Sequence, residues 1–464
     1  MKYRTESDSI GEIQIPDNML YGASTQRAVN NFPFSRHRFS RPMIRALGLV
    51  KWASALTNEE LGKLDSKLAK TIAASALEVA EGKHDAHFVI DVFQTGSGTS
   101  TNMNANEVIA NLSNVKLGGS PGAKKPIHPN DQVNMGQSSN DVIPTAIHVA
   151  VVLEIQDALI PALQKLETAF NKKSGEFKNV IKIGRTHLQD ATPITLGQEF
   201  SAYSAQIRKG IHRVTQTLDG LAELAIGGTA VGTGINTHPQ FGKKVCQKLV
   251  EETGFKFRET DNHFEAQAAK DACVFTSGAL KTLAVSLMKI VNDLRWLASG
   301  PRCGLFEIEL PTLQAGSSIM PGKVNPVIPE AVAQIAAQVI GNDAAITIGC
   351  QAGNFELNVM MPLITHNLIE SVELLSSAAL SLADKCVLGI KANKKHCEAM
   401  VEKSLAMVTS LAPVLGYDKS AKLAKEAFAK NETIRALLEE EKILPKKELE
   451  KLLDPRSMLA PRKD

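Results

Sequence analysis

The segment GSSIMPGKVNP, residues 316–326, combines residue types that could do chemistry together. Glycines surround the adjacent hydroxyls of Ser317 and Ser318, and Lys323 and Asn325 follow within a few positions. Polar, glycine-rich loops next to helix N-termini bind anions. This one contains no histidine, cysteine or carboxylate that could activate a serine or bind a metal ion. It therefore predicts an anion site in which a serine acts without a neighbouring base.

Three other polar segments interrupt the helical pattern of the chain. They are TGSGTSTNMNANE (95–107), HPNDQVNMGQSSND (128–141) and GRTHLQDATP (184–193). Taken singly, each is explained by ordinary helix N-caps and loops. Together with the 316–326 loop they carry hydroxyls, amides, a histidine and a lysine, which are groups that bind carboxylates or phosphates. Because they flank predicted helices, the fold could bring them together.

His187, in the third of these segments, has two interpretations. A histidine in a polar loop is more often structural than catalytic, but Thr186, Gln189 and Asp190 could form a network that orients its ring. His128 lies in the sequence HPND, which turn chemistry explains well. The run GGTAVGTG (227–234) lacks a preceding strand, and the chain contains no P-loop sequence, so nucleotide binding is not indicated.

The elements that must position these loops are long helices. Apolar residues recur at steps of three and four in 152–166, 201–224, 280–294 and 368–382, which is the pattern of amphipathic helices. The segment AVAQIAAQVIG (331–341) is apolar on more than one face, so that helix needs neighbours on several sides. We therefore expect a helical bundle that is buried inside an oligomer.

The ends of the chain differ from its centre, and three domains are predicted. Residues 1–135 mix shorter helices with polar loops and with a strand-like alternation at 11–16. Residues 136–395 carry the long helices, and residues 396–464 carry short charged helices separated by turns. A low aromatic content of 5% agrees with a mainly helical fold.

Charge and composition exclude several classes of function. The net charge of +3 over 464 residues is too small for a typical nucleic-acid-binding protein. No signal-peptide core and no uncharged stretch of 18 apolar residues stands out, so we expect a cytoplasmic protein without a membrane partner. The six cysteines show no metal-ligand spacing, and we expect buried, reduced thiols.

The sequence GSSIMPGKVNP resembles the signature of the fumarase/aspartase superfamily. The similarity runs from GEIQIPDNMLYGASTQR (11–27) to GYDKSAKLAKEA (416–427), nearly the whole chain, and is closest to the class II fumarate hydratases. The resemblance implies an all-α, three-domain fold whose long helices form a bundle of about twenty in a homotetramer. It also implies a carbon–oxygen lyase that needs no cofactor or metal ion and whose active sites draw loops from three subunits.

The same resemblance implies roles for individual residues. Ser317 would be the general base, Lys323 and His187 would also be catalytic, and Glu330 would be the partner of His187. The residues that would bind a small dicarboxylate substrate are Ser97, Gly98, Thr99, Ser138, Ser139, Asn140, Thr186, Ser318 and Asn325. Those matching a second, shallower anion site are His128, Asn130 and Asp131.

This family chemistry answers the question that the 316–326 loop raises. Removing a proton beside a carboxylate creates an aci-carboxylate with two negative charges, and donors such as Lys323 and Asn325 would stabilise it. A serine can serve as base if backbone N–H groups stabilise its oxyanion. Two alternatives stay open. Segments such as LQAGSS and GIKANKK look more like aspartate ammonia-lyase, and a crystallin-like relative would keep the fold without catalysis.

Overall fold

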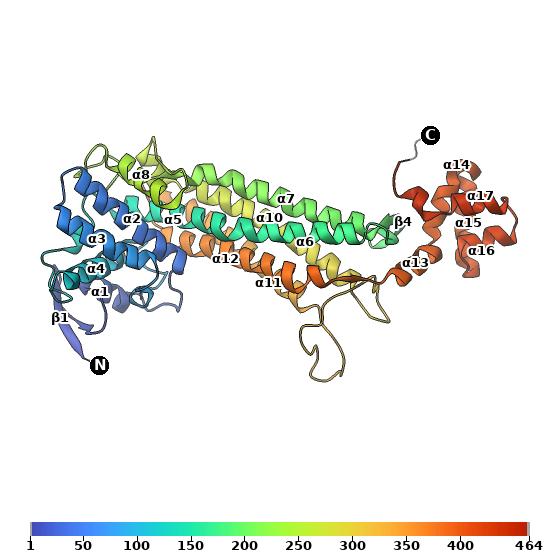
Figure 1. Cartoon of the computed structure of the whole chain (residues 1–464), viewed down its shortest axis with the longest axis horizontal. Helices are drawn as coiled ribbons and strands as arrows, with labels where there is room; N and C mark the ends of the chain where they lie inside the picture. Colours follow the sequence, from blue (N-terminus) through green and yellow to red (C-terminus); the bar gives the residue numbers. More distant parts are fainter. Residues whose placement is uncertain (1, 462–464) are drawn as a thin grey trace. The chain divides into compact units, whose positions relative to one another are not determined.

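The computed structural model describes residues 2–461, so the outermost residues of the predicted first and third domains lie outside the described part. The contacts divide the chain into two compact units. Unit 1 contains the residues up to 161, 212–284 and 337–376, and unit 2 contains 162–211, 285–336 and the residues from 377 onwards. Helices make up most of both units (Figure 1), which confirms the prediction of a mainly helical fold.

Unit 1 contains short helices and small pairs of strands. Its elements are β1 (Tyr3–Asp8), β2 (Gly11–Pro16), α1 (Ala23–Asn31), α2 (Arg41–Glu60), α3 (Ser66–Ala80), η1 (Asp85–His87), α4 (Thr99–Lys116), η2 (Pro129–Val133), α5 (Ser139–Glu154), η3 (Ile155–Leu159), β5 (Glu223–Leu224), α8 (Phe241–Thr253), β6 (Arg258–Glu259), α9 (His263–Ala268), β8 (Gly353–Asn354) and β9 (Leu357–Asn358). Helices α2, α3 and α4 pack on one another within this unit.

Five long helices have residues in both units, namely α6 (Ile160–Glu176), α7 (Leu196–Leu221), α10 (Asp271–Leu297), α11 (Val327–Cys350) and α12 (Met361–Lys385). The remaining elements belong to unit 2: β3 (Ile181–Thr186), β4 (Gln189–Thr195), β7 (Ile308–Glu309), η4 (Val387–Gly389), β10 (Lys391–Ala392), α13 (Lys394–Lys403), η5 (Leu405–Leu411), α14 (Ala412–Leu415), α15 (Tyr417–Lys430), α16 (Ile434–Glu440), α17 (Lys446–Leu452) and η6 (Pro455–Met458).

The predicted apolar stripes are the buried faces of the long helices. On α7 the buried stripe includes Ile207, Val214 and Leu221, and the predicted apolar positions of α10 and α12 are buried as well. Helix α11 keeps Ile340 and Ile348 exposed, as expected for a helix that is apolar on several faces. By length and hydropathy alone, the continuous helix Ser139–Glu176 and helices α10 and α11 are long and apolar enough to cross a membrane.

Strands occur only in pairs within residues 2–461. The alternation at 11–16 is confirmed as β2, which pairs with β1 in an antiparallel hairpin. The polar segment 184–193 is not the interhelical loop that the sequence suggested, because β3 and β4 form a hairpin there. The strand pattern of this hairpin was not recognised in the sequence because its tip carries many polar residues.

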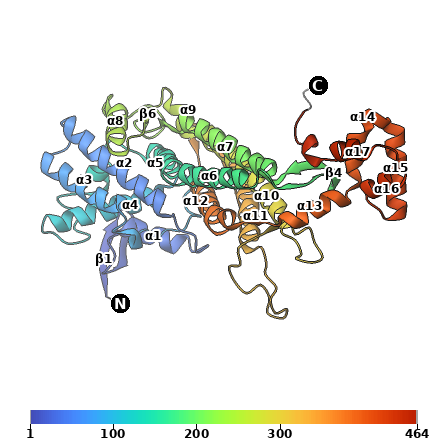
Figure 2. The ribbon, with the colours of Figure 1, turned by 45° about the vertical axis from the view of Figure 1, so that its right-hand side comes forward.

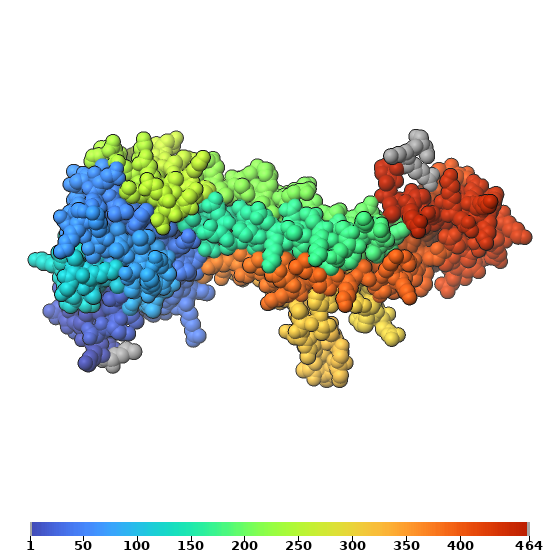
Figure 3. Space-filling view, in the orientation of Figure 1, coloured from blue at the N-terminus to red at the C-terminus, as the bar shows by residue number. Residues whose placement is uncertain are grey.

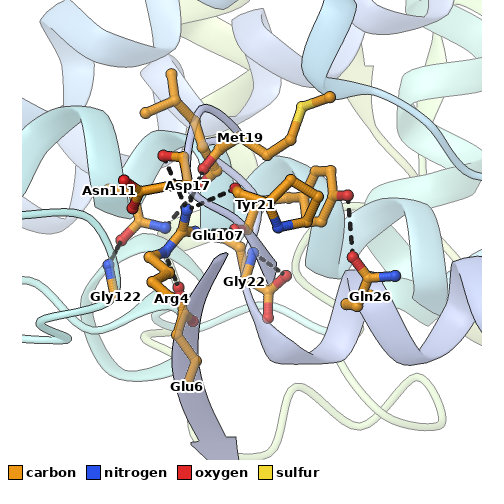
Figure 4. Close-up of polar contacts among 12 residues, drawn as sticks. Arg4, Glu6, Asp17, Met19, Tyr21, Gly22, Gln26, Glu107, Asn111 and Gly122 are labelled. Carbon is orange, nitrogen blue, oxygen red and sulfur yellow. Dashed lines mark hydrogen bonds and ion pairs between the residues drawn. The ribbon is translucent and has the colours of Figure 1, made fainter. Parts of the chain in front are cut away.

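Buried polar contacts tie the N-terminal hairpin to α1 and α4 (Figure 4). The guanidinium of Arg4 donates to the carbonyls of Met19 and Tyr21, both at 2.6 Å. The buried carboxylate of Glu107 on α4 accepts N–H bonds from Gly22 and Thr25 at 2.9 and 3.1 Å. Burial raises the pKa of Glu107, and these donors oppose that rise. The first turn of α1 is thereby fixed to α4.

The C-terminal helices of unit 2 surround a small core of their own (Figure 2). Ile183 of β3 belongs to this core together with residues such as Leu411 and Leu437, so the β3–β4 hairpin packs on the C-terminal helices. The prediction that all six cysteines are buried is partly wrong. Cys303 is exposed and Cys350 is half-buried, and both lie near the ends of long helices.

Candidate active site

Helix α4 begins in the first predicted binding segment. Gly98 precedes the helix at φ 72°, a left-handed conformation that favours glycine, and a Cβ there would lie 3.0 Å from Ile143. This turn brings the Ser97 and Thr99 hydroxyls within 2.7 Å of each other. Thr99 Oγ1 in turn lies 2.7 Å from Ser139 Oγ. Two predicted segments therefore meet through their hydroxyl groups.

Helix α5 begins in the second predicted segment, with a capping box. The Ser138 side chain accepts from the N–H of Asn140 at 3.2 Å, and Asp141 Oδ1 accepts from Ser138 N–H at 2.9 Å. The other oxygen of this buried carboxylate accepts N–H groups of the 227–229 turn at 2.9 and 3.1 Å. Asn140 donates to the Ala230 carbonyl at 2.8 Å. The α5 N-terminus is thus held firmly in place.

The two helix N-termini form one polar surface in unit 1. The first-turn N–H groups of a helix have no partner within the helix, and the helix dipole favours negative charge there. Thr99 and Ser139, which are the first residues of α4 and α5, are directly hydrogen-bonded. The arrangement can bind a carboxylate group.

Thr186 and His187 lie at the tip of the β3–β4 hairpin in unit 2. His187 and Leu188 form the two-residue turn, with φ of 57° and 59°, as in a type I′ turn. The side chains of Thr186 and His187 are exposed. Within residues 2–461 the imidazole has no hydrogen-bond partner, so the orienting contact suggested for Gln189 is not formed in this chain.

A buried group of charges supports the base of this hairpin. Lys182 Nζ lies 2.9 Å from Glu199 and 3.2 Å from Glu307, and Arg185 lies 2.9 Å from the other oxygen of Glu307. Glu307 is fully buried. Two positive and two negative side chains balance, which avoids an unpaired buried charge. The group fixes the strands that present His187.

Ser317 lies in a tight turn of the loop between α10 and α11. Its Oγ accepts the backbone N–H groups of Ile319 and Met320 at 3.2 and 2.9 Å. The side chain is half-buried, whereas the neighbouring Ser318 is exposed. Two convergent N–H donors on one oxygen stabilise negative charge on it, so the loop favours the oxyanion of Ser317.

The neck of the same loop is closed by three short contacts. Gly316 N–H donates to the Lys323 carbonyl at 3.0 Å, and the Asn325 amide donates to the Gly316 carbonyl. A Cβ at Gly316 would lie 2.3 Å from the Lys323 carbonyl oxygen, so only glycine fits. Lys323 Nζ donates to Asn325 Oδ1 at 2.7 Å. The loop projects from the surface of unit 2 (Figure 3).

Beneath the loop, unit 2 contains a cavity of about 800 Å³. Lys323, Asn325 and Glu330 line it, together with the aromatic rings of Trp296 and Phe306. Glu330 belongs to the first turn of α11. The cavity therefore combines an ammonium group, an amide and a carboxylate with apolar walls, as small-molecule sites do.

The predicted second anion site is a single turn of unit 1. The His128 Nδ1 atom accepts from Asn130 N–H at 3.2 Å and from Asp131 N–H at 3.4 Å. The Asn130 and Asp131 side chains are exposed. These contacts fix the ring but use the same N–H groups that an anion would need.

The predicted residues therefore fall into separate groups. Unit 1 holds Ser97, Gly98, Thr99, Ser138, Ser139 and Asn140, with His128, Asn130 and Asp131 in another turn. Unit 2 holds Thr186, His187, Ser317, Ser318, Lys323, Asn325 and Glu330. Within residues 2–461, no group of three or more histidine, cysteine, aspartate or glutamate side chains is placed to hold a metal ion.

Several supporting residues escaped the sequence reasoning. Asp141 could have been found, because Ser138 and Asp141 have the spacing of a capping box. Lys51 interrupts an apolar helical run, which is a weak signal for a buried, paired lysine. Lys182 and Glu307 are far apart in the sequence, and no local pattern relates them.

Comparison with known proteins places this fold and these segments in a lyase family. Residues 11–341 match the lyase family, and residues 407–460 match the family described as fumarase C C-terminus. The class II fumarase of Schistosoma mansoni has a TM-score of 0.96 at 38% identity, covering all of both chains. A fumarate lyase:delta crystallin structure from Brucella melitensis, described as bound to cobalt, has a TM-score of 0.95 at 45% identity, covering 99% of this chain and 100% of that one.

The curated relatives define the branch more narrowly. The chain is 51% identical to the class II fumarate hydratase of Methylorubrum extorquens over 99% of this chain and 97% of that protein. It is also 51% identical to the mitochondrial fumarate hydratase of Saccharomyces cerevisiae, over 99% and 94% of the two chains. The chain belongs to the class II fumarate hydratase family.

Proposed function

We propose that this protein catalyses the reversible hydration of fumarate to L-malate. The observation that carries the proposal is that about half of all residues are identical to those of class II fumarate hydratases, along nearly the whole chain. The hydrogen-bonded N-termini of α4 and α5 and the N–H groups around Ser317 support it, because they suit a dicarboxylate and a serine base.

One substrate carboxylate is proposed to bind at the α4 and α5 N-termini. Ser97, Thr99 and Ser139 supply hydroxyls. Ser138 and Asn140, whose hydrogen bonds to each other and to Ala230 fix the start of α5, are proposed to complete the same surface. Gln94 accepts the Thr101 N–H at 3.0 Å, so the N–H groups of Thr99 and Ser100 at the start of α4 are the ones proposed to bind the carboxylate. The substrate is held without a metal ion in this scheme.

In the direction of dehydration, the oxyanion of Ser317 takes a proton from the CH2 carbon of L-malate, which lies beside one of the two carboxylates. The C–H electron pair moves into that carboxylate and forms the aci-carboxylate. Lys323 and Asn325 are proposed to stabilise its two negative charges, and Ser318 is proposed to bind the substrate. The electron pair then returns to form the C=C double bond while the C–O bond breaks. His187, whose partner is Glu330, gives a proton to the hydroxyl, which leaves as water.

We also propose a homotetramer in which Thr186 and His187 reach a site formed with other subunits. Large apolar side chains remain exposed on the long helices of one chain, including Phe275, Trp296 and Ile348 at 59%, 54% and 58%. Large apolar side chains that are exposed along helices are typical of an interface. The three-domain division at 135 and 395 and a cytoplasmic location are retained as part of the proposal. Anion binding at His128, Asn130 and Asp131 is proposed as well, and it requires the ring of His128 to release the two N–H groups that it accepts.

The activity is tested by following the absorbance of fumarate with L-malate or with L-aspartate as substrate. Turnover of L-malate, unchanged after treatment with a chelator, is the expected result. Turnover of L-aspartate with release of ammonia, but not of L-malate, would instead identify an aspartate ammonia-lyase, and absence of both reactions would favour a crystallin-like protein. A requirement for added iron would contradict the metal-free mechanism.

A further inference from the structure

A lysine is buried within unit 1, on a helix whose other buried residues are uncharged. Lys51 lies on α2 and is 0% exposed. Its ammonium group donates to Asn134 Oδ1 and Gln137 Oε1, both at 2.9 Å. Burial lowers the pKa of Lys51 to about 7, and the negative charge of Asp141 opposes that decrease. Such a side chain is costly in a core unless its hydrogen bonds compensate for its desolvation.

The acceptor of this lysine also receives bonds from a second helix. Asn102 and Asn106, one turn apart on α4, each donate to Asn134 Oδ1 at 3.2 Å. The amide nitrogen of Asn134 donates to the Gln137 carbonyl at 3.1 Å. Asn134 Oδ1 thus accepts one hydrogen bond from α2 and two from α4. The amide nitrogen of the same side chain fixes the segment that leads into α5.

This cluster lies close in sequence to both predicted carboxylate-binding ends. Asn102 is three residues after Thr99, the first residue of α4, and Gln137 immediately precedes the N-cap Ser138 of α5. The hydroxyl contact between Thr99 and Ser139 joins the same two ends at 2.7 Å. The bonds to Asn134 thus connect the segments that carry the two helix N-termini.

We propose that Lys51 is a positioning residue for substrate binding: through Asn134 and Gln137 it holds the α4 and α5 N-termini at the separation at which they share one substrate carboxylate. Lys51 itself does not contact the substrate. This inference rests on the proposed function of those two helix ends. It explains why a cation is buried next to the segments that carry them. A displacement of either end by a fraction of an ångström lengthens the charge-assisted bonds to the carboxylate.

Lys51→Met tests the proposal, because methionine fills similar space without charge or donors. We expect KM for L-malate to rise about tenfold with kcat within about twofold, since interactions shared by substrate and transition state act on KM. The matched control is Lys270→Met. Lys270 is 2% exposed in the same unit and donates only to the carbonyls of residues 266, 267 and 269. This control should lose thermal stability and keep its KM.

A double-mutant cycle separates positioning from general destabilisation. Asn134→Leu should raise KM by a similar factor, and the double variant Lys51→Met/Asn134→Leu should not exceed the larger single effect, because both changes remove the same link. Independent, multiplying effects on KM would overturn the proposal. So would a Lys51→Met enzyme that loses stability as the control does while its KM stays within twofold of the wild type.

Two further measurements cover the remaining outcomes. If Lys51→Met does not fold, Asn102→Leu removes a single donor from the cluster, and an unchanged KM in that variant overturns the proposal. Amide hydrogen exchange at residues 139–141 should quicken in Lys51→Met even without turnover, because the α5 end is released. A wild-type protein that turns over no L-malate would instead refute the proposed function, and exchange at 139–141 would then decide whether Lys51 positions this end.

Discussion

Replacing Ser317 by alanine should abolish turnover while leaving the fold intact. The Oγ atom accepts two N–H groups, from Ile319 and Met320, and this is the feature that suits it to act as an oxyanion. Alanine removes the proton acceptor and, with it, the two hydrogen bonds that Oγ accepts. Because proton removal occurs in the transition state, the loss should appear in kcat and leave KM nearly unchanged.

The expected changes in kcat and in stability can both be estimated. General-base catalysis typically contributes a factor of about 10²–10⁴, so kcat should fall by at least about a hundredfold. The stability change should be small, since the two lost bonds lie within one half-exposed loop and each net contribution is about 0.5–1.5 kcal/mol at most. The melting temperature of Ser317→Ala should therefore stay close to that of the wild type.

The assay follows fumarate absorbance during dehydration of L-malate, together with binding of a non-reactive dicarboxylate by calorimetry. Ser318→Ala is the neighbouring comparison, and it should change KM more than kcat because Ser318 is assigned to binding. A Ser317→Ala enzyme that keeps more than about a tenth of the wild-type kcat would refute the role of Ser317 as base. Equal losses of kcat in both variants would place the effect in the loop as a whole.

Three more predictions follow from the same geometry. His187→Asn and Lys323→Ala proteins should each be nearly inactive. If subunits share active sites, refolding the two proteins together should restore part of the activity. Inactive hybrid tetramers, identified by mass measurement, would contradict this. Gly98→Ala should raise KM for L-malate by about fivefold or more, because φ is 72° and Ile143 is close, and the strain costs about 1–2 kcal/mol; an unchanged KM would show that the turn adapts. Burial lowers the pKa of His148 from 6.5 to about 4. As pH falls from about 6.5 to about 4, the unfolded chain is therefore protonated before the folded protein, and the stability of the fold decreases by up to about 3 kcal/mol. In thermal unfolding, His148→Gln should lose less stability than the wild type over that pH range, and equal losses would disprove the assignment.

The sequence by itself determined the long helices and singled out the segments of the proposed site. Apolar steps of three and four are a local property, and tertiary packing has only to bury the stripe they form; α7, α10 and α12 follow them. The segments 95–107, 128–141 and 316–326 could be selected because glycines, hydroxyls and amides are rare in such helical surroundings. The resemblance to a family then supplied roles that no local pattern contains.

What only the tertiary structure decided are the contacts between segments that are distant in the chain. Thr99 meets Ser139 across 40 residues, and Lys51 meets Asn134 across 83. The apolar run around Lys51 is only a weak signal of burial, because whether a lysine is solvated or is buried and hydrogen-bonded depends on which helix packs against it. The hairpin at 181–195 escaped detection for a similar reason: its strands are stabilised by Glu307 and by the C-terminal core, over a hundred residues later.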